Sequence, residues 1–579
     1  MKRMWLALVA ALMMTGLCAA PAWAAPGDNH AHDDPFTAAR TAWWRGDRFG
    51  MFIHFGDYSN WQGVYQKPDG TTCQSAEWIL QNCQIPMKEY EAKAATFNPA
   101  AFDATKIVNL AEAAGQRYIV ITAKHHDGYA MWPTKVNTWN LRDHSAFDKH
   151  RDILAELKAA ADKAGITFGI YYSIKDWHDT GCQHDFPAYR KNMYAQLKEL
   201  VTDYHPALLW FDGACPAWSP AEGDNLQNYL HGLNPDLVVN NRVGKRRIVD
   251  GDYSTPERTI PAAPVDGAPW ETCDTIASHW GYNRNDTFKS PVTLTRNLLD
   301  IVSRDGNFLL NIGPTDTGAV PTGQSTVLQA MGSWLSANGS AVRDAGYTGL
   351  VADPDWGAVS RSGDKLYASV YDWGRPLHLT ARSKFTITGA RVLGSTQSVA
   401  WKASGDGYDL TPSGGATNGT ATVIELTVTT PPTVTTAPGT GLTAQYWPNA
   451  TFTGKPSVTR VDPTLNFAWQ LDGSPAPSIP VGAFSARWTG SVAVPVSDNY
   501  SLATVSDDTA QVWVDGKLVI DASKPHAVRV DKAVVGLTAG RHTIRVDYTQ
   551  AGDEAYLKLL WSSPNIGQRI IPAGSLYPA

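Results

Sequence analysis

Short apolar runs alternate with amphipathic stretches between about residues 40 and 345, and this alternation constrains the fold more than any other feature. The runs are rich in Val, Ile, Leu, Phe and Tyr without a period of two, which is typical of strands buried on both faces. They occupy Arg48–Phe55, Tyr118–Lys124, Thr167–Ser173, Ala207–Asp212, Leu237–Arg242, Pro269–Cys273 and Phe308–Pro314. Between them, stretches such as Asp103–Ala114 and Asp152–Ala164 repeat apolar residues at helical spacing and end before a glycine. The pattern predicts an α/β fold, with a parallel (β/α) barrel over residues 38–345. A doubly wound sheet is the alternative, although no GxGxxG motif follows any run.

The chain changes character after residue 345. Over residues 346–428, short β-branched runs alternate with Gly, Ser and Asp turns, which predicts a small β-sandwich. Residues 429–441, TTPPTVTTAPGTG, form a Pro/Thr-rich segment that predicts an extended linker. Residues 442–579 again contain only strand-like runs and turn signals, so we expect a second all-β module there.

The N-terminus has the features of a signal peptide over residues 1–25. Lys2 and Arg3 precede a short apolar run, and Ala22-Trp23-Ala24 is a small-x-small cleavage site. We therefore expect a secreted or periplasmic protein, and no later run is long enough to predict a membrane span. The polar residues 26–37 are predicted to be disordered. Five cysteines remain after cleavage, so at least one thiol is free, and Cys73–Cys83 is the favoured disulfide.

Composition narrows the classes of partner. The formal net charge of -6 argues against a nucleic acid as the natural partner. The chain contains 22 Trp and 22 Tyr, and an excess of aromatic faces suggests surfaces that contact sugars. Nothing in the sequence indicates the oligomeric state.

Polar and aromatic residues follow the ends of several predicted strands. In a parallel barrel these ends carry the active site. The residues at these ends are His54, His125, His126, Tyr171, Tyr172, Asp212 and Arg242. A zinc site made by the three histidines and Asp212 is an alternative, but the spacing lacks the H-x-x-x-H pattern of a metal-binding helix.

Two carboxylates favour glycoside hydrolysis. Asp212 ends the buried run ALLWF, where a carboxylate is costly unless it is paired or used. Glu257 lies in the loop-like segment GDYSTPE, and hydrolysis of a glycosidic bond requires two such groups. Arg242 could keep Asp212 ionised. The alternatives are that Asp212 is a helix N-cap and that Glu257 is a solvated loop residue.

Nine segments in a fixed order resemble the α-L-fucosidases of glycoside hydrolase family 29. They are RFGMFIHFGDYS, YIVITAKHHDGYAMWPTK, FGIYYSIKDWH, LLWFDG, NNR, GDYSTPE, WETC, SHWGYN and NFLLNIGPTDTG. The resemblance implies a retaining exo-glycosidase on a (β/α) barrel, with no metal or other cofactor required. It implies Asp212 as nucleophile and Glu257 as acid/base, with Glu271 of WETC as the reserve candidate. The implied substrate-binding residues are His54, Glu77, Trp78, His125, His126, Tyr172, Arg242 and Trp280. Strand alternation lets only one of Tyr171 and Tyr172 point inward, and Tyr172 is the one we expect.

The C-terminal region resembles a protective-antigen-type (PA-14) β-sandwich module, on the segments GLTAQYWPNATFTG, ARWTGSVAVPVSDNYSLATVSDDTAQVWVDGKLV and AYLKLLWSSP. Such modules often bind carbohydrate. In some relatives an Asp-Asp pair holds calcium, here matched by Asp507 and Asp508; the alternative is that the pair only tightens a turn.

The expected function is removal of terminal α-linked L-fucose from fucosylated oligosaccharides or glycoconjugates, with the motif variants closest to the α-1,3/1,4-preferring branch. Another retaining exo-glycosidase and a non-catalytic carbohydrate-binding protein are the alternatives. The presence of both Asp212 and Glu257 argues against the second of these.

Overall fold

The computed structural model describes residues 34–431, 437–471 and 473–579. The predicted signal peptide and most of the segment predicted to be disordered therefore lie outside the described residues. Residues 34–37 of that segment form an ordered turn, and Phe36 is buried against the C-terminal module, which corrects the prediction for these four residues.

A parallel sheet forms the centre of the N-terminal half, as predicted. Its order is β7-β6-β5-β4-β1-β9-β8, and every pairing within it is parallel. The strands are β1 (Phe49–Ile53), β4 (Tyr118–Lys124), β5 (Thr167–Ser173), β6 (Leu208–Asp212), β7 (Val238–Val239), β8 (Trp270–Thr275) and β9 (Gly306–Ile312). Nearly every residue in them is buried, which explains why their sequences lack alternation.

One segment closes the gap between β7 and β8. Tyr253 bridges to Asn240 beyond β7, while Ser254 and Glu257 bridge to Trp270 and Cys273 of β8, and all three bridges are parallel. We call residues 253–257 the closing segment. It stands where an eighth barrel strand would stand, but its bridges are isolated and it forms no regular strand. The described chain therefore forms a TIM-like barrel with one irregular member.

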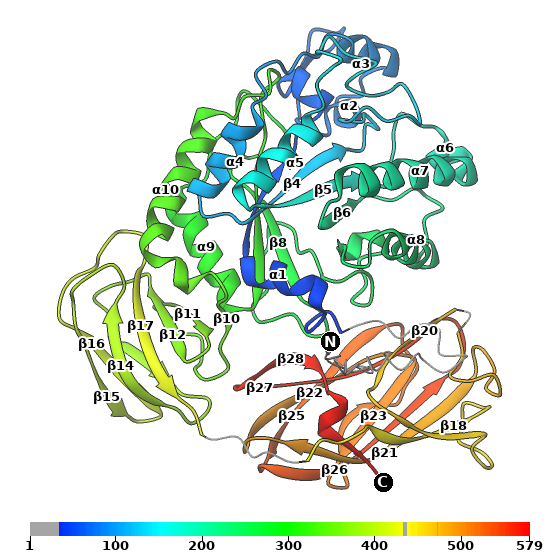
Figure 1. Cartoon of the computed structure of the whole chain (residues 1–579), viewed down its shortest axis with the longest axis vertical. Helices are drawn as coiled ribbons and strands as arrows, with labels where there is room; N and C mark the ends of the chain where they lie inside the picture. The colour runs from blue at the N-terminus through cyan, green and yellow to red at the C-terminus, as the bar shows by residue number, and fades with distance from the viewer. Residues whose placement is uncertain (1–33, 432–436, 472) are drawn as a thin grey trace, which may run out of the picture.

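Helices surround the sheet (Figure 1). Asp103 and Asp152 cap α4 and α5 with side-chain carboxylates, and Gly165 ends α5 in a left-handed conformation, as its position after the apolar repeat predicts. The helices are α1 (Ala39–Asp47), α2 (Ile79–Asn82), α3 (Met87–Ala94), α4 (Ala104–Ala113), α5 (Ile153–Ala164), α6 (Gly181–His184), α7 (Phe186–Tyr204), α8 (Pro220–Leu233), α9 (Pro291–Ser303) and α10 (Thr322–Asn338). Short 3-10 helices η1 (Asp57–Trp61), η2 (Asn241–Val243) and η3 (Gly339–Ala341) and a hairpin of β2 (Val64–Gln66) and β3 (Thr72–Gln74) complete this half.

A β-sandwich follows the barrel and packs beside α9 and α10 (Figure 1). One sheet has the order β10-β11-β12-β17-β14 and the other β13-β16-β15. The strands are β10 (Gly346–Tyr347), β11 (Gly357–Ser362), β12 (Lys365–Val370), β13 (Leu377–Thr380), β14 (Thr386–Val392), β15 (Val399–Ser404), β16 (Gly407–Pro412) and β17 (Thr422–Thr429).

The C-terminal module is a second, larger sandwich with its own apolar core. One sheet runs β19-β18-β21-β26-β23-β24 with β29 on β21, and the other runs β20-β27-β22-β25 with β28 on β27. The strands are β18 (Leu442–Trp447), β19 (Val458–Asp462), β20 (Asn466–Gln470), β21 (Phe484–Val494), β22 (Asp498–Asp507), β23 (Thr509–Val514), β24 (Lys517–Ala522), β25 (Arg529–Leu537), β26 (Gly540–Gln550), β27 (Ala555–Ser563), β28 (Ile566–Ile570) and β29 (Leu576–Pro578), with η4 (Ala573–Ser575) before the last. In Figure 1 this module lies below the barrel and close to α1.

Candidate active site

A cavity of about 260 Å³ opens at the carboxyl ends of the barrel strands. Nine of the predicted site residues line it together, although they come from segments spread over more than two hundred positions. The lining consists of Phe52, His54, Glu77, Trp78, His125, His126, Tyr171, Lys175, Trp210, Asp212, Gly213, Arg242, Arg246, Glu257, Cys273 and Trp280. A pocket of aromatic walls with a few convergent polar groups is typical of a small-ligand site.

Asp212 lies at the last position of β6, and its carboxylate has several partners. Arg242 Nη1 donates to Oδ1 over 2.7 Å, and the Tyr171 hydroxyl donates to Oδ2 over 3.1 Å. His126 Nε2 is 3.6 Å from Oδ2, and Arg246 Nη2 is 3.4 Å from Oδ1. Burial alone would raise the pKa of Asp212, but the positive charge and hydrogen bond of Arg242 outweigh it and lower that pKa far below its usual range. The carboxylate is therefore ionised at any working pH, as predicted from Arg242.

Glu257 shares the same guanidinium. Arg242 Nη2 donates to Glu257 Oε2 over 2.9 Å while Nη1 binds Asp212, so one arginine holds both carboxylates on the same cavity. The Arg242 guanidinium also stacks on Trp210, 4.4 Å from its ring centre. The Glu257 side chain is 38% exposed, whereas that of Asp212 is 17% exposed. The two carboxylates thus differ in their access to solvent.

Three histidines line the same cavity, and burial keeps them neutral. Burial is the main cause that lowers the pKa of His54 to about 3, that of His126 to about 4, and that of His125 well below its usual value. His54 Nδ1 is 2.7 Å from Asn311 Oδ1, and His126 Nδ1 is 2.7 Å from Ser173 Oγ. Neutral imidazoles so oriented can donate to or accept from hydroxyl groups of a ligand.

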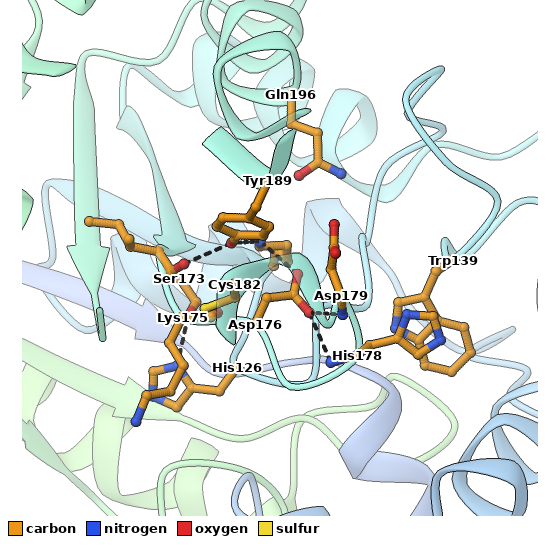
Figure 2. A network of polar contacts seen from close by, with 12 residues as sticks. His126, Trp139, Ser173, Lys175, Asp176, His178, Asp179, Cys182, Tyr189 and Gln196 are labelled. Atoms are coloured by element: carbon orange, nitrogen blue, oxygen red, sulfur yellow. Dashed lines mark hydrogen bonds and ion pairs between the residues drawn. The ribbon is translucent and has the colours of Figure 1, made fainter. Parts of the chain in front are cut away.

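The loop after β5 contacts His126 through Ser173 and also contributes Lys175 to the cavity (Figure 2). Ser173 Oγ, which contacts His126, donates to the Lys175 carbonyl over 2.5 Å, and Asp176 Oδ1 accepts from the backbone of His178 and Asp179. A disulfide, Cys182–Cys215, joins this loop to the one that follows Asp212. Lys175 and Gly213 of the two tied loops both line the cavity, so the disulfide fixes the region next to Asp212.

Tyr172 was the wrong choice between the two adjacent tyrosines. Its hydroxyl donates to Gln196 over 2.7 Å and its ring lies 4.5 Å from Lys124 Nζ, away from the cavity. Tyr171 is the inward residue, because β5 pairs with β6 so that Tyr171 lies beside Trp210 and Ser173 beside Asp212. Alternation from Asp212 through this register would have identified it.

Glu271, the reserve acid/base, does not line the cavity. It is fully buried behind Trp210, where it accepts hydrogen bonds from Tyr118 (2.6 Å), Trp44 (3.0 Å) and Trp210 (3.1 Å). Several lining residues were not predicted from the sequence: Phe52, Lys175, Trp210, Arg246 and Cys273. Strand parity would have found Phe52 and Trp210, two positions before His54 and Asp212, but no periodic signal marks Lys175 or Arg246.

The cysteines bear out the disulfide prediction. Cys73 and Cys83 are bonded, and Cys273 is a free, buried thiol.

In the part of the chain that the structure describes, no helix is both long and apolar enough to cross a bilayer. Among the same residues, no three His, Cys, Asp or Glu side chains group closely enough to hold a metal ion.

Comparison with known proteins agrees with this geometry. The α-L-fucosidase family model matches residues 22–340, and the PA14 domain model matches residues 438–575. The tissue α-L-fucosidase of Homo sapiens is 30% identical over 450 residues, covering 69% of this chain and 91% of the human protein.

Solved structures show the same likeness. α-L-Fucosidase isoenzyme 1 of Paenibacillus thiaminolyticus is 32% identical with a TM-score of 0.60, over 68% of this chain and 99% of that one. A family 29 α-L-fucosidase of Bacteroides thetaiotaomicron is 26% identical with a TM-score of 0.64, over 69% and 97%. The α-L-fucosidase of Vibrio sp. strain EJY3 is 25% identical with a TM-score of 0.61, over 89% and 97%. The chain is therefore a glycoside hydrolase that belongs to the α-L-fucosidases of family 29, with a PA14 domain at its C-terminus.

Proposed function

We propose that this protein is an exported exo-α-L-fucosidase that removes terminal α-linked L-fucose by double displacement. The observation that carries the proposal is that Arg242 joins Asp212 and Glu257 on a single cavity of monosaccharide size. A related enzyme of Bacteroides thetaiotaomicron, 27% identical, has been trapped as a covalent intermediate with 2-fluoro-fucosyl fluoride. That chemistry supports retention here.

In the first step, the ionised Asp212 attacks the anomeric carbon and forms a glycosyl ester. Glu257 gives its proton to the departing oxygen, so that the aglycone leaves as a neutral alcohol. In the second step, Glu257 removes a proton from water, the water oxygen bonds to the anomeric carbon, and Asp212 is released as a carboxylate. Arg242 serves both steps because it contacts both carboxylates.

The other lining residues would bind the sugar. The neutral histidines His54, His125 and His126 supply hydrogen bonds for hydroxyl groups, and Tyr171 takes the role assigned to Tyr172. Glu77 is buried, which raises its pKa, and its Oε2 accepts from Gly281 N over 2.9 Å, leaving Oε1 to accept from the sugar. Trp78, Phe52 and Trp280 offer apolar surfaces for the ring and methyl group of fucose.

The leaving-group dependence of Glu257→Ala tests the mechanism. Removal of the proton donor should slow poor leaving groups by about 10²–10⁴-fold, while activated aryl fucosides should slow far less. NMR of the first-formed product should show the α-anomer. Equal slowing of both substrate classes, or a β-anomer as first product, would contradict the assignment.

Linkage and location belong to the same proposal. We propose a preference for α-1,3- and α-1,4-linked fucose, tested on a panel that adds α-1,2 and α-1,6 linkages; faster release from the last two would refute it.

The disulfides Cys73–Cys83 and Cys182–Cys215 favour an oxidising compartment and hence export. N-terminal sequencing of the protein recovered outside the cytoplasm should begin near Ala25 or Pro26.

We also propose that the PA14 domain binds carbohydrate, with calcium at Asp507 and Asp508. The pair offers adjacent carboxylates, but calcium takes six to eight oxygen ligands, so backbone carbonyls and water would supply the rest. Asp508 Oδ2 already accepts from Ala551 N over 2.7 Å, which also fits the turn-tightening role. Calorimetric titration of calcium into wild type and Asp508→Asn distinguishes the two.

A further inference from the structure

The connection between β7 and β8 is the least regular part of the barrel and carries much of its chemistry. It spans residues 240–269, far longer than an ordinary connection, and its only helix is η2. Arg242, Arg246 and Glu257 all lie on it. From Glu257 onward, residues 257–259 and 262–263 are exposed, so the barrel covers little of this part of the connection.

The C-terminal module contacts the connection before the closing segment. Arg247 pairs with Glu554 of the module and lies 5.6 Å from the ring centre of Tyr556. The neighbouring Ile248 and Val249 pack into an apolar cluster with module residues that include Val505 and Leu560. Arg247 is adjacent to Arg246, whose Nη2 lies 3.4 Å from Asp212 Oδ1, so the contact with the module anchors the backbone next to a residue that lines the cavity.

The module contacts the connection again after the closing segment. Asp266 pairs with Lys532 over 2.6 Å and accepts from Gln568 Nε2 over 2.9 Å. The Gly267 N–H donates to Gln568 Oε1 over 2.6 Å. Gly267 has a φ of +91° and a Cβ there would lie 3.0 Å from Val505, so glycine permits both the turn and the close approach.

We propose that the C-terminal module braces the closing segment from both sides and so holds Glu257 in position for proton transfer. Glu554 and Lys532 are positioning residues: neither touches the cavity, and each anchors one flank of the segment that bears Glu257. A displacement of about 1 Å at a reacting group can cost about 10²-fold in rate, so a weak brace would be costly. This inference rests on the proposed role of Glu257 as acid/base.

The test uses the full-length chain and three module variants. Glu554→Lys and Lys532→Glu each reverse the charge of one anchor, and Asp521→Asn is the matched control, because Asp521 bonds Gln511 within the module. For each protein, kcat/KM is measured on fucosides with poor and with activated leaving groups. Hydrogen exchange of residues 245–267 and the melting temperature are recorded in parallel.

We expect Glu554→Lys to lower kcat/KM about tenfold for poor leaving groups and less than about twofold for activated ones. Lys532→Glu should show the same bias more weakly. Combining Asp266→Lys with Lys532→Glu re-forms the ion pair with exchanged charges and should restore the wild-type leaving-group dependence. Exchange within residues 245–267 should quicken in the two single variants and not in the control.

Wild-type leaving-group dependence in both single variants would overturn the proposal, whether or not exchange quickens. If Glu554→Lys does not fold, Lys532→Glu and its charge-swapped partner decide the matter. If Glu257→Ala itself lacks leaving-group dependence, the proposed mechanism fails and the brace fails with it. A normal result for Glu257→Ala with unbiased module variants refutes the brace alone.

Discussion

The two halves of the active site are built on different kinds of backbone. Asp212 ends a regular, buried strand and contacts Arg242, Tyr171 and the edge of His126. Glu257 ends an irregular closing segment, is more than twice as exposed, and has one charged partner. The difference matches the proposed roles, because a nucleophile must be fixed and ionised whereas an acid/base must exchange protons with leaving group and water.

The largest effect is expected from replacing Asp212, the carboxylate at the end of the regular strand β6. Asp212→Gly should lower kcat by about 10⁴–10⁶-fold, since it removes the proposed nucleophile. Added azide should restore part of the rate by entering the vacated space, and the product should be β-fucosyl azide. The melting temperature must stay near that of wild type for the loss to be chemical. Substantial activity without azide would contradict the assignment.

Protonation of His126, which lies beside Asp212, should make the free energy of unfolding depend on pH. An unfolded histidine titrates near 6.5, and burial lowers the pKa of His126 to about 4, so the folded chain binds fewer protons between these values. Its contribution to stability is complete above pH 6.5, is lost as pH falls, and is gone below about 4. Urea unfolding at pH 7 to 4 should show a loss up to about 3 kcal/mol smaller in His126→Asn. His150→Asn, at an exposed position, should follow wild type; parallel curves for all three would contradict the burial argument.

The same contrast explains what the sequence could predict. Strands such as Tyr118–Lys124 and Thr167–Ser173 have the predicted bounds because continuous burial leaves a continuous apolar run. The run Leu237–Arg242 shrinks to the two residues of β7, and the closing segment carries no run, since its pairing is confined to isolated bridges. The sequence pattern therefore left open whether Glu257 is a solvated loop residue, and its role as acid/base was implied only by the family resemblance.

Contacts between the C-terminal module and the barrel could not be predicted from the sequence. The residues that bind the module to the barrel, such as Arg247 with Glu554, are separated by 307 positions and read locally as surface charges. The disulfide Cys182–Cys215 was missed for a similar reason, because it joins two loops whose proximity follows only from the pairing of β5 with β6. The alternation of side chains along β5, by contrast, could be inferred from the sequence, and it favours Tyr171 rather than Tyr172.

The adjacent tyrosines give a matched pair on the nucleophile side. Tyr171→Phe removes the hydroxyl that donates to Asp212, and loss of a hydrogen bond to a charged group should lower kcat/KM about 10- to 100-fold. Tyr172→Phe removes the bond to Gln196 and should change kcat/KM less than about threefold while lowering the melting temperature. The reverse order of effects on kcat/KM would restore the original choice of Tyr172.

Glu271 offers the finest test, because it asks whether Glu257 of the closing segment or the buried Glu271 of β8 transfers the proton. Burial raises the pKa of Glu271 to about 7, although hydrogen bonds from Tyr118, Trp44 and Trp210 oppose the rise. In Glu271→Gln the amide nitrogen cannot accept, and the cheapest orientation turns it toward Trp210, leaving one indole N–H unpaired at a cost of about 1–2 kcal/mol. Since Trp210 lines the cavity and stacks on Arg242, kcat/KM should fall only a few fold, equally for poor and activated leaving groups. Calorimetric melting and the two-substrate assay measure both effects. If Glu271→Gln instead slows poor leaving groups selectively, proton transfer passes through the buried carboxyl, and the contrast between a fixed nucleophile and an exposed acid/base does not hold.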